Sequence, residues 1–345
     1  MIDKMMSNIH MEYAGNSDEI IIVYSSDDKF AHVMGVSLVS VFENNQDASE
    51  IIVFILDDKI SSLNKNKLIS VFNKYNSKYH FIDVSQLIIP DFIISNRWPK
   101  SAIIRLYISN LLPNSVSRIL YLDCDTIINQ SLKELWNIDM DNKIIAGVND
   151  CVGNGYKKNL GININSPYIN SGVLLIDLNR FRRFDCEAKI NSFMSKYGKV
   201  IRYPDQDIIN GIFEGNILVL EPRYNAMTIF YDFTYMDMLK YRKPSFFYTR
   251  DQIEAALLKP SIIHFTSSFL SVRPWVKGSK HPQLSKYLRY KKLSPWSERE
   301  LNKDNRGAIT KIYSSLFRIM PSSLSIGFSG WLHANLLPWI LAKRG

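Results

Sequence analysis

Residues 118–128, RILYLDCDTII, place two carboxylates two residues apart at the end of an apolar run. In a β-strand, residues i and i+2 point to the same face, so Asp123 and Asp125 would share one face and Cys124 would point to the other. The D-x-D pattern alone is weak evidence, because the chain also contains it at Asp139/Asp141 and Asp205/Asp207. Only the first pair ends an apolar strand, and that position indicates a site rather than a turn.

Similar apolar runs alternate with helix-like segments through the first 270 residues. The runs EIIIVY (19–24) and EIIVFIL (50–56) are each followed by apolar residues at helical spacing, over 30–45 and 61–75. YHFIDV, KIIAGVND and SGVLLIDL are further short runs rich in Ile, Val and Leu. Strands that are apolar throughout are typical of a mostly parallel sheet covered by helices on both faces. The expected fold class is therefore α/β, with ligands outside the carboxyl ends of the strands.

Polar side chains gather at the predicted strand ends. They are Asp27 and Asp28, Asp123 and Asp125, Asp150, and Asn170 with Ser171. Several carboxylates at one edge repel one another unless a cation neutralises them. Of six histidines, only His264 ends a short apolar run, so Asp123, Asp125 and His264 form the candidate metal site.

Each of these residues also has a structural reading. Asp27 and Asp28 are alternative caps for the following helix, and Asp205 after Pro204 is an alternative N-cap. Asp139/Asp141 is read as a solvated turn. Cys124 is read as a small buried residue rather than a nucleophile.

The composition sets the domain boundary. The chain has 345 residues and a net charge of +9, but residues from Arg273 onward hold 14 Lys/Arg against 3 Asp/Glu, a net of +11. We therefore expect a catalytic domain over 19–282 and a basic, aromatic-rich helical region over 283–345. Residues 1–19 lack the apolar core of a secretory signal, and three cysteines imply no disulfide framework, so we expect a reducing cytoplasm.

The C-terminal region predicts membrane association. ITKIYSSLFRIM (309–320) places apolar residues at helical spacing with Lys311 and Arg318 among them, and four of six tryptophans follow residue 272. A basic helix with Trp and Leu on its other face lies in a membrane interface. The alternatives are a tail packed on the catalytic domain or in a dimer. No nucleic-acid motif accompanies the basic residues, so nucleic acid is not an expected partner.

Four motifs carry a family resemblance. LYLDCDTII, NSGVLLIDLNRFRR, PDQDIINGIF and HF…RPW occur in an order similar to that of the family 8 retaining glycosyltransferases, over residues 19–282. This family includes bacterial lipopolysaccharide and capsule galactosyl- and glucosyltransferases, and glycogenin. The resemblance implies the nucleotide-sugar GT-A fold, a Rossmann-like sheet with a metal at its edge.

The resemblance also implies residue roles. Asp123, Asp125 and His264 would hold Mn²⁺, with Mg²⁺ as the alternative, and the metal would bridge the diphosphate of a UDP-sugar. The implied donor-binding residues are Ser25, Ser26, Asp27, Lys29, Arg105, Asp123, Cys124, Asp125, Asn170, Ser171, Asp205, Gln206 and Arg273. Asp150, Asn170, Ser171, Asp205 and Gln206 would line the transferred hexose, and all of these except Ser171 form the implied catalytic set. Lys29 stands where the family often has Asn, and the loop between His264 and Arg273 is longer than in well-known members.

The expected function is a retaining hexosyltransferase that extends a lipid-linked glycan on the cytoplasmic face of the membrane. Gln206 is a poor nucleophile, which favours attack on the same face as departure, with Asp205 holding sugar hydroxyls. A sugar nucleotidyltransferase is one alternative, but YSSDDKFAHVMG is not a Gly-rich phosphate loop. A non-catalytic membrane-bound scaffold is the other, and an oligomer is compatible with either.

Overall fold

The computed structural model describes residues 19–87, 89 and 100–343, so the N-terminal stretch without a signal pattern lies almost entirely outside the described residues. Its centre is a seven-stranded sheet of order β3-β2-β1-β4-β7-β6-β8. The strands are β1 (Glu19–Asp27), β2 (Glu50–Asp58), β3 (Lys78–Asp83), β4 (Arg118–Leu122), β6 (Ile145–Asn149), β7 (Ile169–Asp177) and β8 (Ile217–Leu220). β7 pairs antiparallel with β4 and β6, and the other neighbouring pairs are parallel. The predicted α/β fold with a mostly parallel sheet is confirmed.

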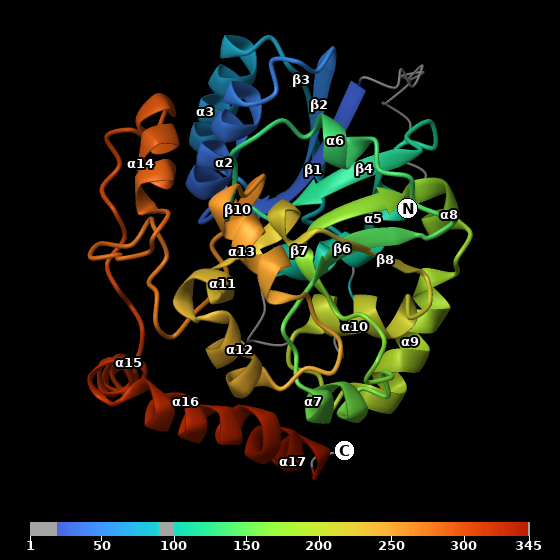
Figure 1. The fold of residues 1–345 in the computed structure, drawn as a ribbon. Helices are drawn as coiled ribbons and strands as arrows, with labels where there is room; N and C mark the ends of the chain where they lie inside the picture. The colour runs from blue at the N-terminus through green and yellow to red at the C-terminus, as the bar shows by residue number, and fades with distance from the viewer. Residues whose placement is uncertain (1–18, 88, 90–99, 344–345) are drawn as a thin grey trace.

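Helices cover both sides of the sheet. Figure 1 shows α2 (Ala31–Glu43) and α3 (Ser62–Lys74) on one side, and α8 (Leu178–Arg182) and α9 (Cys186–Tyr197) on the other. The β-branched runs of β1 and β2 are buried along nearly their whole length, as strands between two helical layers must be. Ser61 caps α3, because its hydroxyl accepts the Asn64 N–H at 3.3 Å. Both helices expected at 30–45 and 61–75 are present.

Short helices connect the strands and build the rim of the sheet. They are α4 (Lys100–Ile103), η1 (Ile104–Tyr107), α5 (Ile108–Leu111), α6 (Lys133–Trp136), α7 (Asn154–Asn159), α10 (Pro204–Ile212), η2 (Pro222–Asn225), α11 (Thr228–Asp232), α12 (Tyr235–Arg242) and α13 (Arg250–Leu258).

A second sheet determines where His264 lies. It has the order β5-β10-β9, formed by β5 (Thr126–Ile128), β10 (Ile262–His264) and β9 (Ala226–Met227). β5 begins directly after Asp125, and β10 pairs antiparallel with it, so that His264 is opposite Thr126. The histidine therefore reaches the edge of the main sheet from a separate sheet, beside the paired aspartates.

The segment after residue 282 begins within the packed body of the protein. α14 (Leu284–Leu293) lies against α2, and Asn44 Nδ2 donates to the Tyr290 hydroxyl at 2.8 Å. The Trp296 ring fills the space over Gly35, where a Cβ would lie 2.0 Å from a ring carbon. Trp275 and Trp296 are thus buried, and they do not belong to an interfacial surface as their position in the sequence suggested. The boundary at 282/283 stays a prediction.

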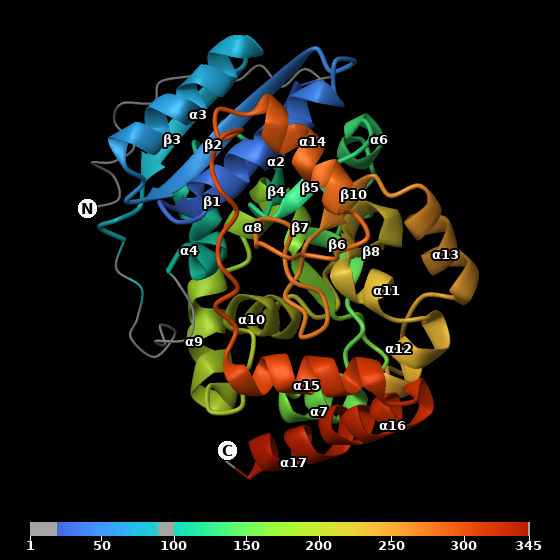
Figure 2. The ribbon, with the colours of Figure 1, turned by 90° about the vertical axis from the view of Figure 1, so that its left-hand side faces the viewer.

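The last helices form an elongated arm. α15 (Ala308–Ile319), α16 (Ser322–Trp331), the π-helical turn η3 (Leu332–Leu336) and α17 (Leu337–Ala342) run along one end of the molecule, away from the main sheet (Figures 1 and 2). One face packs on the rest of the molecule: Phe317 contacts Phe233 and Phe269, and His333 contacts Tyr241. The expected helix over ITKIYSSLFRIM is confirmed.

The other face of this arm is apolar and exposed. The exposed side chains, which we call the outer face, are Ile309, Ile312, Leu316, Ile319, Met320, Leu324, Phe328, Trp331 and Trp339. Ten of the 14 basic residues counted from Arg273 precede Gly307, so most of the positive charge lies outside these helices. Within the part of the chain that the structure describes, no helix has the length and apolarity needed to cross a bilayer.

Candidate functional site

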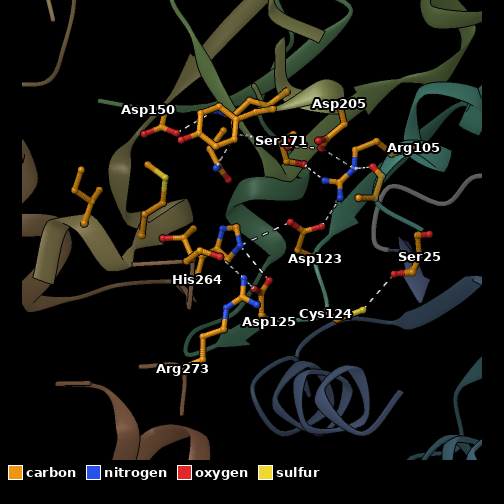
Figure 3. Close-up of a pocket in the computed structure, with 18 of the residues that line it drawn as sticks. Ser25, Arg105, Asp123, Cys124, Asp125, Asp150, Ser171, Asp205, His264 and Arg273 are labelled. Carbon is orange, nitrogen blue, oxygen red and sulfur yellow. Dashed lines mark hydrogen bonds and ion pairs between the residues drawn. The ribbon is translucent and has the colours of Figure 1, made fainter. Parts of the chain in front are cut away.

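The predicted site residues line one cavity. It has a volume of about 500 Å³ and lies at the carboxyl ends of β1, β4 and β6. The starts of β7 and α10 also contribute, since β7 runs antiparallel and begins at this edge. Of the residues predicted from sequence, the cavity is lined by Ser25, Ser26, Arg105, Asp123, Cys124, Asp125, Asp150, Asn170, Ser171, Asp205, Gln206, His264 and Arg273. Figure 3 shows Ser25 and Asp150 on opposite sides of the close-up, with Asp123 between them.

Three potential metal ligands converge at its centre. One donor atom from each of Asp123, Asp125 and His264 lies within 4.8 Å of the others. His264 Nε2 is 3.1 Å from Asp125 Oδ1 and 3.7 Å from Asp123 Oδ2. The Asn225 Oδ1 is 2.9 Å from His264 Nδ1 and can only accept, so Nδ1 carries a proton and Nε2 faces the carboxylates. Three acceptors directed at one point suit a divalent cation, so these residues fit a metal.

Gly172 makes room for this convergence. A Cβ there would lie 2.2 Å from His264 Cε1 and 2.6 Å from Asp123 Oδ2. Its carbonyl accepts the Asp123 N–H at 2.7 Å, which fixes the chain just after β4. Glycine is required at this position because of the close approach of the imidazole.

Two arginines partly neutralise the carboxylates. Arg105 donates to Asp123 Oδ1 at 2.7 Å and lies 3.2 Å from Asp205 Oδ2, and Arg273 lies 3.2 Å from Asp125 Oδ2. Burial raises the pKa of Asp123, against the opposing effect of Arg105. Burial acts in the same direction on Asp125, but His264 and Arg273 outweigh it and lower the pKa of that carboxyl. The centre thus contains carboxylates paired with arginines, and an incoming metal and anion can replace the partners in these ion pairs.

A hydrogen-bonded network adjoins the metal ligands on the Asp150 side. Gln206 Oε1 accepts from Asn170 Nδ2 at 3.0 Å, and Gln206 Nε2 donates to Asp150 Oδ2 at 3.1 Å. The Ser171 hydroxyl donates to Asp205 Oδ2 at 2.7 Å. The structure therefore brings together all five residues expected to line the hexose.

Asp205 is not the N-cap of α10, so that structural alternative is wrong. The N-cap residue is Tyr203, and its N–H donates to Asp207 Oδ2 at 2.8 Å, as does the N–H of Arg202. The hydroxyls of Tyr156 and Tyr168 also donate to Asp207. Burial raises the pKa of Asp207 to about 6, against these donors. Because Asp207, and not Asp205, accepts the N–H groups of Arg202 and Tyr203 before the helix, the Asp205 carboxylate is available to pair with Arg105.

Two predicted nucleotide contacts lie outside the cavity lining. Asp27 Oδ1 accepts the Phe30 N–H at 3.0 Å just before α2, and Lys29 is exposed. Asp28 Oδ1 accepts the Ser61 N–H at 2.8 Å, at the start of α3. Neither aspartate caps the following helix as the structural alternative proposed, because the N-cap of α2 is Phe30 without a side-chain cap and Asp28 binds at α3. The nucleotide roles of Asp27 and Lys29 stay predictions.

The two other structural readings agree with the structure. The Cys124 thiol is buried and donates to the Ser25 carbonyl at 3.2 Å, and burial raises its pKa, so it is not poised as a nucleophile. The Asp141 N–H donates to Asp139 Oδ1 at 3.0 Å in an exposed turn. Asp139/Asp141 is thus a solvated turn.

Sequence reasoning missed three residues of this site: Asn225, Gly172 and Arg242. Gly172 lies inside the motif NSGVLLIDL but was not singled out there. Asn225 ends the turn η2, and Arg242 ends α12. Neither of the last two follows an apolar strand-like run of the kind that guided the search.

The comparison with protein families agrees with this geometry. The model of the family "Glycosyl transferase family 8" matches residues 21–277. General stress protein A of Bacillus subtilis is 28% identical over 81% of this chain and 96% of its own length. Lipopolysaccharide 1,2-glucosyltransferase of Escherichia coli K12 is 25% identical over 86% of this chain and 85% of its own length.

Solved structures support the fold. The galactosyltransferase LgtC, in complex with donor and acceptor sugar analogues, superposes with a TM-score of 0.68 at 24% identity, over 80% of this chain and 96% of that one. The bifunctional glycosyltransferase WbbM gives a TM-score of 0.67 over 82% of this chain and 52% of its own. The chain therefore has the GT-A type of fold.

Proposed function

This chain belongs to glycosyltransferase family 8, and we propose that it transfers a hexose, galactose or glucose, from a UDP-sugar to a glycan acceptor with retention of anomeric configuration. The observation that carries the proposal is the cluster of Asp123, Asp125 and His264 beside Arg105 and Arg273 in one cavity. Hard oxygen ligands with one imidazole, next to two guanidinium groups, are suited to a diphosphate held by a divalent cation.

The metal of the proposal is Mn²⁺, with Mg²⁺ as the alternative, held by Asp123, Asp125 and His264. When bound, it would act as a Lewis acid for the diphosphate leaving group. The role of Asn225 is to hold a proton on His264 Nδ1, so that Nε2 is the nitrogen that faces the carboxylates. Gly172 keeps the space beside the imidazole open.

Arg105 and Arg273 have the geometry to accept the leaving diphosphate. In the structure each pairs with a ligand carboxylate, Arg105 with Asp123 and Arg273 with Asp125. If those carboxylates turn to a metal, both guanidinium groups can donate to phosphate oxygens instead. Preorganised donors of this kind stabilise the charge that develops as the bond to the sugar breaks.

The hydrogen bonds of Gln206 bear on how the anomeric configuration of the transferred sugar is retained. Gln206 is held through its amide by Asn170 and Asp150, and an amide oxygen is a poor nucleophile for a glycosyl intermediate. Asp205 is engaged with Arg105 and Ser171. We therefore assign Asp205 to binding sugar hydroxyls, with the acceptor attacking the face from which the diphosphate leaves.

The Asp205→Asn variant tests this assignment. It removes a charge that faces Arg105 and leaves a neutral amide for the sugar hydroxyls, so we expect kcat for transfer to fall at least tenfold. Turnover within threefold of the wild-type value would contradict the role of Asp205. The Asp237→Asn variant, at the exposed start of α12, is the matched control.

The function itself is tested by metal-dependent release of UDP. UDP-Gal, UDP-Glc, UDP-GlcNAc and UDP-GalNAc are each incubated with full-length protein and Mn²⁺, and then with added chelator. We expect release from one UDP-hexose that stops with the chelator and in Asp125→Asn. A non-catalytic scaffold gives no release. A sugar nucleotidyltransferase also gives no UDP, but forms UTP and hexose 1-phosphate from the UDP-hexose when pyrophosphate is added.

The outer face of the C-terminal arm supports a membrane-bound setting for this reaction. We propose that it lies in the interface of an anionic bilayer on the cytoplasmic side, where a lipid-linked lipopolysaccharide or capsule precursor is the acceptor. Nine large apolar side chains are exposed there, on helices whose opposite face is anchored to the catalytic domain. Exposed apolar surface of this kind marks an interaction site.

A further inference from the structure

Arg242 differs from the other arginines of the cavity because no carboxylate in the described part of the chain pairs with it. It is partly buried at the end of α12 and lines the cavity beside Asp150, Cys151 and Tyr203. Its Nε is enclosed without a hydrogen-bond partner. Among the residues that the structure describes, no carboxylate forms an ion pair with it, whereas Arg105 and Arg273 both have one. A buried cation without a partner is costly, and an anionic ligand would offset that cost.

The side chain is held in this position from both sides. Its guanidinium lies 4.9 Å from the centre of the Tyr241 ring. Its backbone carbonyl oxygen lies close to Gly153, where an added Cβ would be 2.5 Å from that oxygen. Burial acts to lower the pKa of Arg242, but Tyr241, Tyr203 and Asp150 nearby raise it, so the group is a cation. These contacts fix the guanidinium at the cavity wall.

The order of the strands places Arg242 beyond the donor. The sheet runs β1-β4-β7-β6, so Ser25 after β1 and Asp150 after β6 are three strands apart, or about 14 Å at the usual spacing. The proposed metal ligands lie after β4, between them. The donor diphosphate would be held there by Arg105 and Arg273, and the transferred hexose by the network that runs from Asn170 to Asp150. Arg242, beside Asp150 at the end of that network, is therefore left for the acceptor.

The same arginine adjoins the C-terminal arm. Gly330 of α16 packs against the backbone of Lys240 and Tyr241, and the His333 ring contacts the Tyr241 ring at 4.8 Å. Burial, together with the nearby charges of Arg242 and Arg202, lowers the pKa of His333 to about 3. Arg242 therefore stands between the sugar network and the helices that carry the outer face.

We propose that Arg242 binds an anionic group, a phosphate or a carboxylate, carried by the acceptor glycan between its reacting hydroxyl and its lipid end. This inference rests on the proposed transferase function and specifies the chemical class of its acceptor. The planar guanidinium suits either anion through paired N–H donors. The competing explanation is a purely structural one, in which Arg242 only complements the negative C-terminal end of α12.

The test measures binding without turnover. Full-length protein is saturated with UDP and Mg²⁺, so that Arg105 and Arg273 are occupied. Dissociation constants are then measured by ligand-observed NMR for galactose, galactose 6-phosphate and galacturonate. We expect at least one charged sugar to bind ten times more tightly than galactose, and the stronger of the two identifies phosphate or carboxylate as the recognised group.

Two substitutions of Arg242 and one control variant test whether the tighter binding of a charged sugar depends on Arg242. Arg242→Gln should remove the advantage of the charged sugar, and Arg242→Lys should retain part of it. Arg289→Gln is the control, because Arg289 also lies over its neighbouring tyrosine ring, at 5.5 Å, on the exposed surface of α14, and it should keep the full advantage.

Equal binding of the three sugars to the wild-type protein, or an advantage that persists in Arg242→Gln, overturns the proposal in favour of the structural role. A tenfold loss of UDP affinity in Arg242→Gln with unchanged sugar preference would assign the residue to the donor and also overturn it. If no UDP-hexose is hydrolysed but the preference depends on Arg242, the transferase function fails and the anion site stands.

Discussion

At the scale of single residues, a few buried polar groups decide what the site can bind. Asn225 is such a residue: its amide oxygen faces His264 Nδ1, and its amide nitrogen donates to Asn170 Oδ1 at 2.9 Å. It therefore links the proposed metal ligands to the sugar network without lining the metal position itself. Groups that orient a metal-binding histidine in this way strongly affect metal affinity.

The Asn225→Ala variant is expected to bind Mn²⁺ roughly 10–100-fold more weakly than the wild-type protein. The imidazole loses the acceptor that holds a proton on Nδ1, so Nε2 is no longer fixed as the nitrogen that faces the metal. Isothermal titration of metal-free protein with Mn²⁺ measures the change. In the control Asn45→Ala, a buried amide that accepts the Leu132 N–H is removed far from the site, and Mn²⁺ affinity should not change.

The sequence was sufficient to predict the metal ligands but not the residues that position them. Asp123, Asp125 and His264 each end an apolar run, and that pattern can be read directly. Asn225 ends a short 3₁₀ turn that has no periodicity, and its role depends on the pairing of β9 with β10. Asp205 after Pro204 reads as an N-cap in the sequence, and only the structure shows that Asp207 accepts the N–H groups before the helix instead.

At the scale of elements, the C-terminal arm has one face packed on the molecule and one face exposed. Helical spacing in the sequence predicted α15, but it could not show that Tyr313 and Phe317 pack inward while Ile312 and Leu316 point to solvent. The partners of the inward residues, including Phe269, lie outside the arm and are brought to it only by the tertiary fold.

The double variant Ile312→Asp/Leu316→Asp is expected to weaken binding to anionic vesicles at least tenfold. Both side chains are more than half exposed, so the change should not unfold the protein, but it places charges in an apolar membrane-facing surface. Co-sedimentation with phosphatidylglycerol vesicles measures binding. The double variant Leu63→Asp/Leu258→Asp, also at exposed positions, is the control, and equal losses in the two variants would contradict the proposed role of the outer face.

Two truncations separate the arm from the element that precedes it. A chain ending after residue 306 should lose vesicle binding but keep metal-dependent UDP release. A chain ending after residue 282 should also be destabilised, because loss of buried Trp296 alone removes contacts worth about 3–5 kcal/mol. Thermal unfolding distinguishes them, and equal melting temperatures would show that α14 adds nothing to the catalytic domain.

At the scale of the whole molecule, buried histidines make stability depend on pH. Burial lowers the pKa of His32 and of His281 to about 4, and that of His333 to about 3. The unfolded chain therefore binds more protons than the folded one between these values and about 6.5, so stability falls as pH drops through this range. Asp207 acts in the opposite direction, since its raised pKa adds stability as pH falls from about 6.

We expect the melting temperature to decrease from pH 7 to pH 4.5, because the lowered pKa values of the three histidines outweigh the raised pKa values of buried carboxyl groups such as Asp207. In His281→Asn the amide can still accept the Gln283 N–H, which His281 Nδ1 accepts at 3.1 Å, but it does not titrate. The slope of melting temperature against pH should therefore be smaller in this variant. A slope identical to that of the wild-type protein would show that His281 contributes nothing to the acid sensitivity.

The reversed direction of β7 ties the chemistry to the packing of the core. Val173 pairs with Leu122, and Gly172 next to it leaves the gap that the imidazole occupies. If one amino acid were inserted before Ser171, Ser171 would move into that gap, and every leucine beyond it would move to the opposite face of the sheet. The length of this one strand is therefore constrained twice, by the space that the imidazole needs and by the packing of the core.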